Sequence, residues 1–386
     1  MKEIPVLLLT GYLGSGKTTL VNRILSNAEG IKFAVIVNDI GEVNIDASLI
    51  DRQGLVSSTD DSLVPLQNGC ICCTLKMDLV DQLCGLARSG KFDYIVIEAS
   101  GICEPEPIAR TICSIPLMGP DYIKGACPRL DSIVTVVDAK RLKDEFSCAK
   151  DLLRSNIAED DLESLVIQQL EFCNIILLNK ASLLSPGDLE KVRSIIRQIQ
   201  PRAEILDCDW AGVSLDKLLD TGLFNYEDVS ASAGWVEAVE GPAPENEEEG
   251  EADEYGISTY VYYARKPLDI NKFDNFVAKH WPAGIIRAKG LCYFADDTDR
   301  CYLFEQAGSQ ISMKNIGQWY ATMPEDELRN ALATDPVLRR DWDEEYGDRM
   351  QKLVFIGQHL DKDRIRCALD FCLTSPASPD NSCKAL

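Results

Sequence analysis

The stretch GYLGSGKTT, residues 11–19, limits the fold of this chain more than any other part of it. It fits the phosphate-binding pattern G-x-x-x-x-G-K-[ST], whose glycines let the backbone approach phosphate oxygens and whose N–H groups attract their charge. The apolar run before it, residues 6–10, is typical of a strand buried on both faces, and residues 20–25 have helical spacing. A strand, a glycine turn and a helix therefore occur in the order that this loop requires.

The residues of the loop have expected tasks. Lys17 should reach the β- and γ-phosphates, and the hydroxyl of Thr18 should bind Mg²⁺. Glu98 ends the apolar run 92–97, where the strand-end carboxylate of P-loop NTPases holds Mg²⁺ or positions the attacking water. We therefore predict Lys17 and Glu98 as catalytic residues, with Thr18 and Glu98 as magnesium ligands. The predicted nucleotide-binding residues are Gly11, Gly14, Ser15, Gly16, Lys17, Thr18, Thr19, Asn179 and Lys180.

Asn179 and Lys180 follow the apolar run 173–178 and resemble the start of the Asn-Lys-x-Asp motif with which GTPases read guanine. In that motif the carboxylate accepts hydrogen bonds from the guanine N1–H and the exocyclic amine. Ser182 stands in its place here, and a serine hydroxyl cannot accept two bonds in that bidentate way. These residues alone leave the choice between GTP and ATP open.

Three cysteines of the segment GCICC form a second motif, Cys70, Cys72 and Cys73. Thiolates are soft ligands that suit Zn²⁺, Cu⁺ or Fe–S chemistry. The spacing differs from the Cys-x-x-Cys of a zinc knuckle or a redox pair. Three thiols leave one position for another residue or an incoming ligand, which favours a metal-transfer site over a closed structural site.

Composition narrows the class of protein. The length of 386 residues fits two domains. A formal net charge of −23 opposes binding to nucleic acid and to anionic membranes, because phosphate would be repelled. No apolar stretch could span a bilayer and no leader cleavage site is seen, so a cytoplasmic location is expected. Most cysteines lie singly in apolar settings, for example Cys113, Cys173, Cys292 and Cys367, and are expected to be buried side chains.

Apolar strands and amphipathic helices alternate as far as residue 207, which predicts a mostly parallel sheet covered on both faces. The prolines of the segment 103–107 are expected to block regular structure and to leave a switch segment there. A loop rich in carboxylates, residues 39–46, follows the second strand at the edge where such sheets bind ligands. The predicted strands are 33–38, 92–97, 130–137, 173–178 and 203–207, and the predicted helices are 77–88 and 188–199.

A glutamate-rich run, residues 237–254, interrupts this pattern and is expected to be a disordered linker. Beyond it, strands that follow one another in the chain have helices at either side, as in an α+β unit. The later strands are predicted at 257–265, 285–295, 301–312 and 353–356, and the later helices at 270–279, 324–333 and 362–373. The predicted fold is thus an α/β P-loop NTPase followed by a smaller α+β C-terminal domain. Its parts are a nucleotide domain with the cysteine motif, an acidic linker, the C-terminal domain and a tail, at 1–228, 229–256, 257–374 and 375–386.

This combination resembles the CobW-like GTPases, relatives of the HypB and UreG nickel chaperones. The matching segments are GYLGSGKTTL, NDIGEVNID, GCICC, VIEASGICEPEPIA, LDSIVTVVDA, NK, IIRAKG and YGDRMQKLVFIG. The resemblance implies GTP hydrolysis coupled to delivery of a transition metal, usually zinc or cobalt, and a C-terminal domain that meets client proteins. It implies that Cys70, Cys72 and Cys73 hold the metal, and that Glu42 lies in the loop from which the family adds a carboxylate ligand.

The chain departs from the family at three places. Ser182 replaces the guanine-reading aspartate, and Asp39 replaces the usual glutamate of the switch loop. The linker is acidic where many relatives have a histidine-rich metal store. With two histidines in total, the chain should not be a metal reservoir.

The sequence therefore predicts a GTP-hydrolysing metallochaperone that uses GTP and Mg²⁺ and delivers Zn²⁺, or Co²⁺, to a client metalloprotein. GTP should order the switch segments 39–46 and 98–107, and hydrolysis should relax the thiolate site. An alternative within the family is insertion of cobalt or iron into one dedicated enzyme such as a nitrile hydratase. Alternatives of another class are a P-loop kinase of a small molecule and a non-hydrolysing metal sensor. The oligomeric state is left open, a homodimer included.

Overall fold

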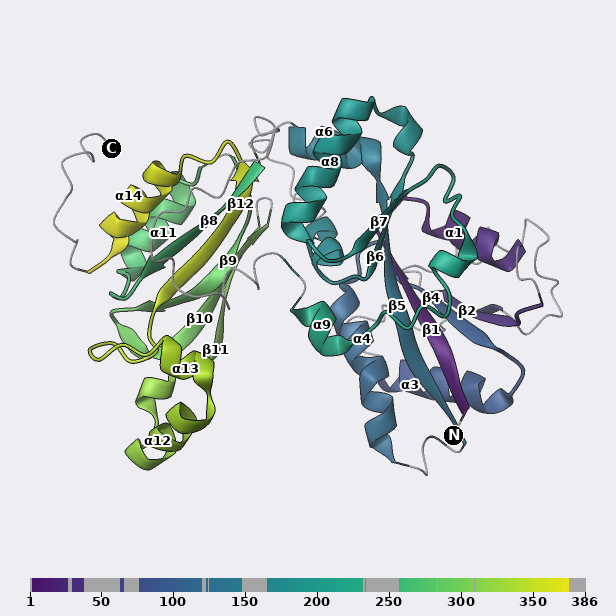
Figure 1. Cartoon of the computed structure of the whole chain (residues 1–386), viewed down its shortest axis with the longest axis horizontal. Coiled ribbons are helices and arrows are strands. Elements are labelled where there is room, and N and C mark those ends of the chain that lie inside the picture. The colour runs from purple at the N-terminus through teal and green to yellow at the C-terminus, as the bar shows by residue number, and fades with distance from the viewer. Residues whose placement is uncertain are drawn as a thin grey trace. The chain divides into compact units, whose positions relative to one another are not determined.

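In the computed structural model the chain forms two units, each built on its own sheet. The first unit is Met1–Ser147 with Leu165–Ala233, and the described residues of the second begin at Ile257 (Figure 1). The described residues are 2–26, 30–37, 63–65, 76–119, 123, 125–147, 165–231, 233, 257–282, 284–307 and 310–374. The predicted acidic linker 237–254 and the tail 375–386 lie outside them.

The described strands of the first unit form a parallel sheet in the order β3-β2-β4-β1-β5-β6-β7. The predicted parallel sheet is therefore confirmed. The chain runs outward from β1 to one edge, returns beside it as β4, and then continues on the other side. The carboxyl ends of β1, β4 and β5 thus meet at the switch point where such sheets bind ligands. The strands are β1 (Lys2–Thr10), β2 (Phe33–Val37), β3 (Leu63–Pro65), β4 (Tyr94–Glu98), β5 (Ala126–Asp138), β6 (Ile175–Asn179) and β7 (Glu204–Asp207).

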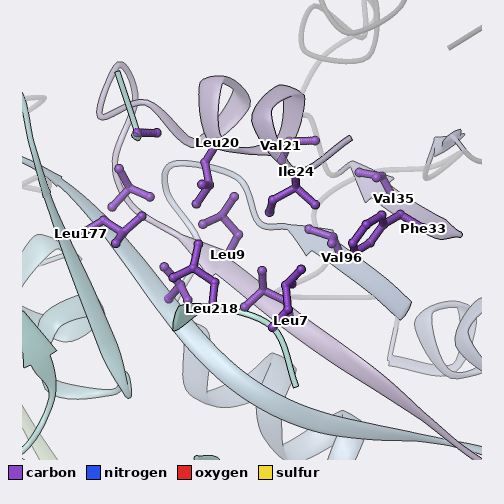
Figure 2. Close-up of a cluster of buried hydrophobic side chains, with 14 of the residues drawn as sticks. Leu7, Leu9, Leu20, Val21, Ile24, Phe33, Val35, Val96, Leu177 and Leu218 are labelled. Carbon is purple, nitrogen blue, oxygen red and sulfur yellow. The ribbon is translucent and has the colours of Figure 1, made fainter. Parts of the chain in front are cut away.

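Helices pack on both faces of this sheet, with α1 and α4 on opposite sides in Figure 1. Figure 2 shows α1 with Leu20 and Ile24 directed at Leu9 and its neighbours on the strands, and Val21 belongs to the same buried cluster. This apolar contact fixes the helix, and with it the loop that precedes the helix, against the centre of the sheet. The helices of the unit are α1 (Lys17–Ser26), α3 (Lys76–Ser89), α4 (Pro105–Ser114), α6 (Ala139–Ser147), α8 (Pro186–Ile199) and α9 (Tyr226–Ser230).

The predicted break in regular structure at residues 103–107 was wrong. The prolines there do not block regular structure, because α4 begins at Pro105. Proline is tolerated in the first turn of a helix, where its missing N–H would have no partner and its fixed φ suits the helix. Glu106 and Arg110 then pair across one turn of this helix at 2.5 Å.

The second unit contains an antiparallel sheet in the order β11-β10-β9-β12-β8. Helices α11 and α14 pack together on one face of it, as Figure 1 shows. Their apolar side chains, among them Phe273 and Leu369, cover Phe304 and Phe355 of the strands. The elements are β8 (Ile257–Ala264), α11 (Ile270–Lys279), β9 (Ile285–Phe294), β10 (Asp297–Ala307), β11 (Gln310–Gln318), α12 (Glu325–Thr334), α13 (Pro336–Arg340), β12 (Gln351–Gln358) and α14 (Lys362–Cys372). The predicted α+β arrangement is therefore confirmed.

The strand predicted at 301–312 was wrong at both ends. Strand β10 already begins at Asp297. Strand β10 ends at Ala307, and a separate strand, β11, begins at Gln310. Strand β11 lies at the edge of the sheet and is exposed along most of its length. It therefore lacks the alternation of buried and exposed residues by which a strand is read from sequence.

The expected burial of single cysteines is confirmed at two of the four positions named. Cys173 and Cys292 are buried, whereas Cys113 and Cys367 are only half-buried. Across the described ranges, no helix combines the length and the apolar content that a membrane span requires.

Candidate functional site

The loop between β1 and α1 depends on glycine at its two ends. Gly11 and Gly16 have φ values of 134° and 116°. A Cβ on Gly11 would lie 2.3 Å from the carbonyl oxygen of Val136, and one on Gly16 would lie 2.4 Å from Nδ2 of Asn179. The loop thus packs directly on β5 and on the end of β6, where only glycine fits. Its N–H groups and the start of α1 form a site that attracts anions.

Lys17 and Ser15 place polar groups inside this loop. The side chain of Lys17 is 7% exposed, and its Nζ donates to the carbonyl oxygens of Gly11 at 2.7 Å and Tyr12 at 3.3 Å. Ser15 is fully buried, and its hydroxyl has no hydrogen-bond partner among the described residues. A buried polar group without a partner is costly. A phosphate oxygen in the loop would accept from both side chains, so the loop fits the predicted ligand.

Thr18 and Glu98 are brought together from α1 and the end of β4. The Thr18 hydroxyl donates to Oε1 of Glu98 at 2.9 Å, and Glu98 is buried. Strand β4 pairs directly with β1, with Glu98 opposite Leu9, so the carboxylate reaches the mouth of the loop. Hydroxyl and carboxylate oxygens are the hard ligands that Mg²⁺ prefers. These two residues therefore fit the magnesium site predicted from the sequence.

The end of β6 is tied to the loop by the predicted pair Asn179 and Lys180. Nδ2 of Asn179 donates to the carbonyl oxygen of Ser15 at 2.8 Å. Nζ of Lys180 donates to the carbonyl oxygen of Gly14 at 3.0 Å and pairs with Asp138 at 2.5 Å. Loop residues and strand-end residues more than 160 positions apart in the chain therefore share one cluster.

Asp138 and Tyr12 belong to this cluster, although neither is among the site residues predicted from the sequence. The Tyr12 hydroxyl donates to the carbonyl oxygen of Asp138 at 3.0 Å and accepts from its N–H at 3.0 Å. The guanidinium of Arg141 lies over the Tyr12 ring, 4.8 Å from its centre. The available signal was that Asp138 ends the run 130–137 at the same sheet edge as Glu98.

A further cluster stands where β6 and β7 end. Ser182 donates from its hydroxyl to Asp209, and Asn179 accepts from the N–H of Ala211 at 3.0 Å. The thiol of Cys208 lies 3.7 Å from Oδ1 of Asn179. Burial, with the carboxylates of Asp209 and Asp207 nearby, raises the pKa of Cys208 to about 11, so its thiol is protonated at neutral pH and can donate.

The predicted transition-metal residues Cys70, Cys72, Cys73 and Glu42 lie outside the described residues, as does the switch loop 39–46. Within the described ranges, no group of three or more His, Cys, Asp or Glu side chains could hold a metal ion. Cys103 of the second switch segment is fully buried. The cysteine site therefore stays a prediction.

Comparison with known proteins covers almost the whole chain. Residues 5–207 match the family described as CobW/HypB/UreG, nucleotide-binding domain. Residues 257–373 match the family described as cobalamin synthesis protein cobW C-terminal domain. The two matches correspond to the two units of the structure.

Three relatives are similar over most of their length. Zinc-regulated GTPase metalloprotein activator 1 of Dictyostelium discoideum is 36% identical over 397 residues, covering 97% of this chain and 81% of the relative. The zinc chaperone CobW of a Sinorhizobium species is 28% identical, covering 83% of this chain and 89% of the relative. The zinc chaperone YjiA of Escherichia coli is 27% identical, covering 95% and 98%.

Proposed function

This chain belongs to the CobW/HypB/UreG family of nucleotide-binding proteins, and on that premise we propose that it is a GTP-hydrolysing metallochaperone. In this proposal it binds zinc, with cobalt as the second choice, at Cys70, Cys72 and Cys73, and delivers the metal to a client metalloprotein. Glu42 is the proposed additional ligand. The similar relatives named above are two zinc chaperones and one zinc-regulated metalloprotein activator, and these names support zinc as the cargo.

The main observation in support of nucleotide binding and hydrolysis is the hydrogen bond from Thr18 to Glu98 beside the glycine loop. It joins a hydroxyl and a carboxylate at 2.9 Å, at the end of the loop where Lys17 is held. A simple glycine turn would need neither a buried lysine nor a buried glutamate, both of which are costly to desolvate. The arrangement suits a triphosphate whose cation is held by oxygen ligands.

Each side chain contributes a distinct part of GTP hydrolysis in this proposal. Lys17 exchanges its loop carbonyl partners for the β- and γ-phosphate oxygens and offsets their charge. Thr18 and Glu98 would hold Mg²⁺, which when bound neutralises the charge that develops on the phosphates. In this proposal Glu98 also orients the attacking water, because its carboxylate lies at the mouth of the loop. Asn179 holds the phosphate loop at a fixed distance from the strand end that would bind the base.

A contact within the first unit supports coupling between nucleotide and metal. The segment after β4 passes directly over the glycine loop, because a Cβ on Gly101 would lie 2.8 Å from the backbone N of Leu13. Ala99 also donates to the carbonyl oxygen of Leu9 at 2.9 Å. A change in the loop therefore reaches the switch segment 98–107 through the backbone. We propose that GTP sets the geometry of the cysteine site through this segment and the segment 39–46, and that hydrolysis releases the metal.

The metal site is tested with Cys72→Ser, compared with Cys113→Ser as a control cysteine of the first unit. We expect parent and control to bind one zinc ion more per chain than Cys72→Ser does, at equal GDP affinity. Zinc is measured by equilibrium dialysis under anaerobic conditions, and GDP by calorimetry. Equal zinc content in Cys72→Ser and in the parent would contradict the proposed zinc site.

A further inference from the structure

Given the proposed GTPase function, the structure also indicates which residue reads the base. Ser182 occupies the place where the Asn-Lys-x-Asp motif has its carboxylate. A carboxylate from another part of the chain, that of Asp209, is nevertheless hydrogen-bonded to Ser182. The Ser182 hydroxyl donates to Oδ1 of Asp209 at 2.9 Å, and the Ser182 N–H donates to the same oxygen at 3.2 Å. Asp209 follows the end of β7 after one intervening residue, Cys208, and β7 is the sheet neighbour of β6. We infer that Asp209, with Ser182 as its partner, is the residue by which this chain selects guanine.

The hydrogen bonds determine which oxygens remain to accept from a base. Both bonds from Ser182 end on Oδ1 of Asp209, and within the described ranges no donor is bonded to Oδ2. Because Ser182 directs its only hydroxyl proton at Asp209, its oxygen is left with lone pairs that can accept. Asp209 is exposed, so these oxygens are accessible.

This pair of acceptors matches one edge of guanine and opposes the same edge of adenine. Guanine presents two donors there, its exocyclic amine and its N1–H, which suit Oδ2 of Asp209 and Oγ of Ser182, respectively. Adenine presents a C–H in place of the amine and a lone pair at N1. The site therefore rejects adenine, because both acceptors would be left without a donor.

Asn179 holds the segment that carries Asp209 beside the phosphate loop, at the carboxyl ends of the strands. Its Nδ2 donates to Ser15 in the phosphate loop at 2.8 Å, and its Oδ1 accepts from Ala211 at 3.0 Å. Ala211 is two residues after Asp209, so one side chain ties the loop to the segment that carries the carboxylate. Parallel sheets bind ligands at the carboxyl ends of their strands, which is where all these residues lie.

The backbone beside Asp209 is held in a conformation that costs energy. Trp210 and Ala211 have φ values of 54° and 53°, in the left-handed region that residues with a Cβ seldom adopt. Ala211 is fully buried, and the N–H of Gly212 donates to the carbonyl oxygen of Asp209 at 2.9 Å. Strain of this kind collects at ligand sites, where it fixes the direction of a side chain.

The test is equilibrium binding of the diphosphates of guanosine, xanthosine, inosine and adenosine to the full chain. The parent should prefer GDP to IDP and ADP, because only guanine offers both donors. In Asp209→Asn, affinity for GDP should fall about tenfold or more, the loss expected for a charged hydrogen bond. Affinity for XDP should rise, because the new amide N–H can donate to the second carbonyl oxygen of xanthine.

Two further variants separate base reading from folding. Asp207→Asn changes a carboxylate two residues away that pairs with Arg193, and it should leave all four affinities unchanged. The exchange Ser182→Asp with Asp209→Ser returns the carboxylate to the motif position and should restore the preference for GDP.

Unchanged GDP preference in Asp209→Asn, with no gain of XDP binding, would overturn the inference. An equal loss for all four diphosphates would also overturn it, because that result indicates a structural role for the carboxylate. Absence of any preference for guanine in the parent would instead contradict the proposed GTPase function, and the inference about Asp209 depends on that function.

Discussion

Among single residues, Glu98 gives the sharpest separation between nucleotide binding and hydrolysis. In Glu98→Gln the amide oxygen can still accept from Thr18, so the local hydrogen bond survives while the negative charge is lost. We expect GTP turnover to fall about 100-fold, as when one charge-stabilising group is removed from an active site. GDP affinity in the absence of Mg²⁺ should stay within about twofold, because the loop that binds phosphate is unchanged.

The measurement is steady-state phosphate release with and without Mg²⁺, and GDP binding in EDTA. Glu106→Gln is the matched control, because Glu106 is a half-buried carboxylate whose partners in the described part of the chain are Arg110 of α4 and Tyr226. Turnover in Glu98→Gln that equals the parent's would exclude Glu98 as a catalytic and magnesium-binding residue.

Site residues that belong to a short continuous motif could be predicted from the sequence. Lys17 and Thr18 are read from one continuous pattern, and Glu98 from a strand that ends in a carboxylate. Asp138 and Asp209 were not singled out, because each acts through a partner 42 or 27 residues away. Such a pairing depends on which strands are neighbours in the sheet, and the local sequence does not contain that information.

At the scale of elements, the position of α1 decides the position of the phosphate loop. Ile24 is fully buried in the cluster shown in Figure 2. Ile24→Ala should lower the free energy of unfolding of the first unit by about 2–4 kcal/mol, from lost burial and the cavity left behind. Ser26→Ala, at the exposed end of the same helix, should change it by less than about 0.5 kcal/mol.

Urea unfolding followed by tryptophan fluorescence and circular dichroism gives both values. A loss in Ile24→Ala no larger than in Ser26→Ala would contradict the packing of α1 on the sheet.

Helices and strands whose apolar residues recur at regular spacing were predictable from the sequence. Elements that depend on pairing with a neighbouring strand or on their position in the fold were not. Helix α11 was predicted with the bounds that the structure shows, Ile270–Lys279. Strand β1 begins at Lys2, earlier than predicted, because its first residues pair with β5 although they are exposed. Helix α4 was missed because its prolines lie in the first turn, and β11 because an exposed edge strand has little apolar signal.

In the second unit, Glu305 of β10 lies between three cations that lower its pKa. Lys289 of β9 lies 2.7 Å away, Lys314 of β11 3.1 Å away, and Arg287 3.6 Å away. Burial alone would raise the pKa of Glu305, but the three cations outweigh it and bring the pKa to about 2. Because the folded pKa is below the ordinary value of 4.5, the charged form stabilises the fold.

That stabilisation is present in full above about pH 5 and is lost as the pH falls toward 2, which gives Glu305→Gln a pH-dependent effect. At pH 7 the variant should be less stable by up to about 3 kcal/mol. The difference between parent and variant should shrink as the pH is lowered from 5 toward 2. Denaturant unfolding at a series of pH values measures it, and a difference that is constant with pH would contradict the predicted ionisation.

For the whole molecule, the central claim is that nucleotide and zinc bind to the first unit in a coupled way. The glycine loop, Glu98 and the segment over the loop share one sheet edge, which gives the coupling a physical route. Coupling between two sites is typically 1–3 kcal/mol, or about 5–150-fold in affinity. By reciprocity, zinc should change the affinity for nucleotide by the same factor.

The most direct test is the zinc dissociation constant of the full chain, measured by competition with a chromophoric chelator under anaerobic conditions. It is determined with a non-hydrolysable GTP analogue, with GDP and without nucleotide, all in the presence of Mg²⁺. We predict that affinity with the GTP analogue exceeds affinity with GDP by about tenfold, and that Cys72→Ser abolishes the difference. Equal zinc affinity in all three nucleotide states would contradict the account.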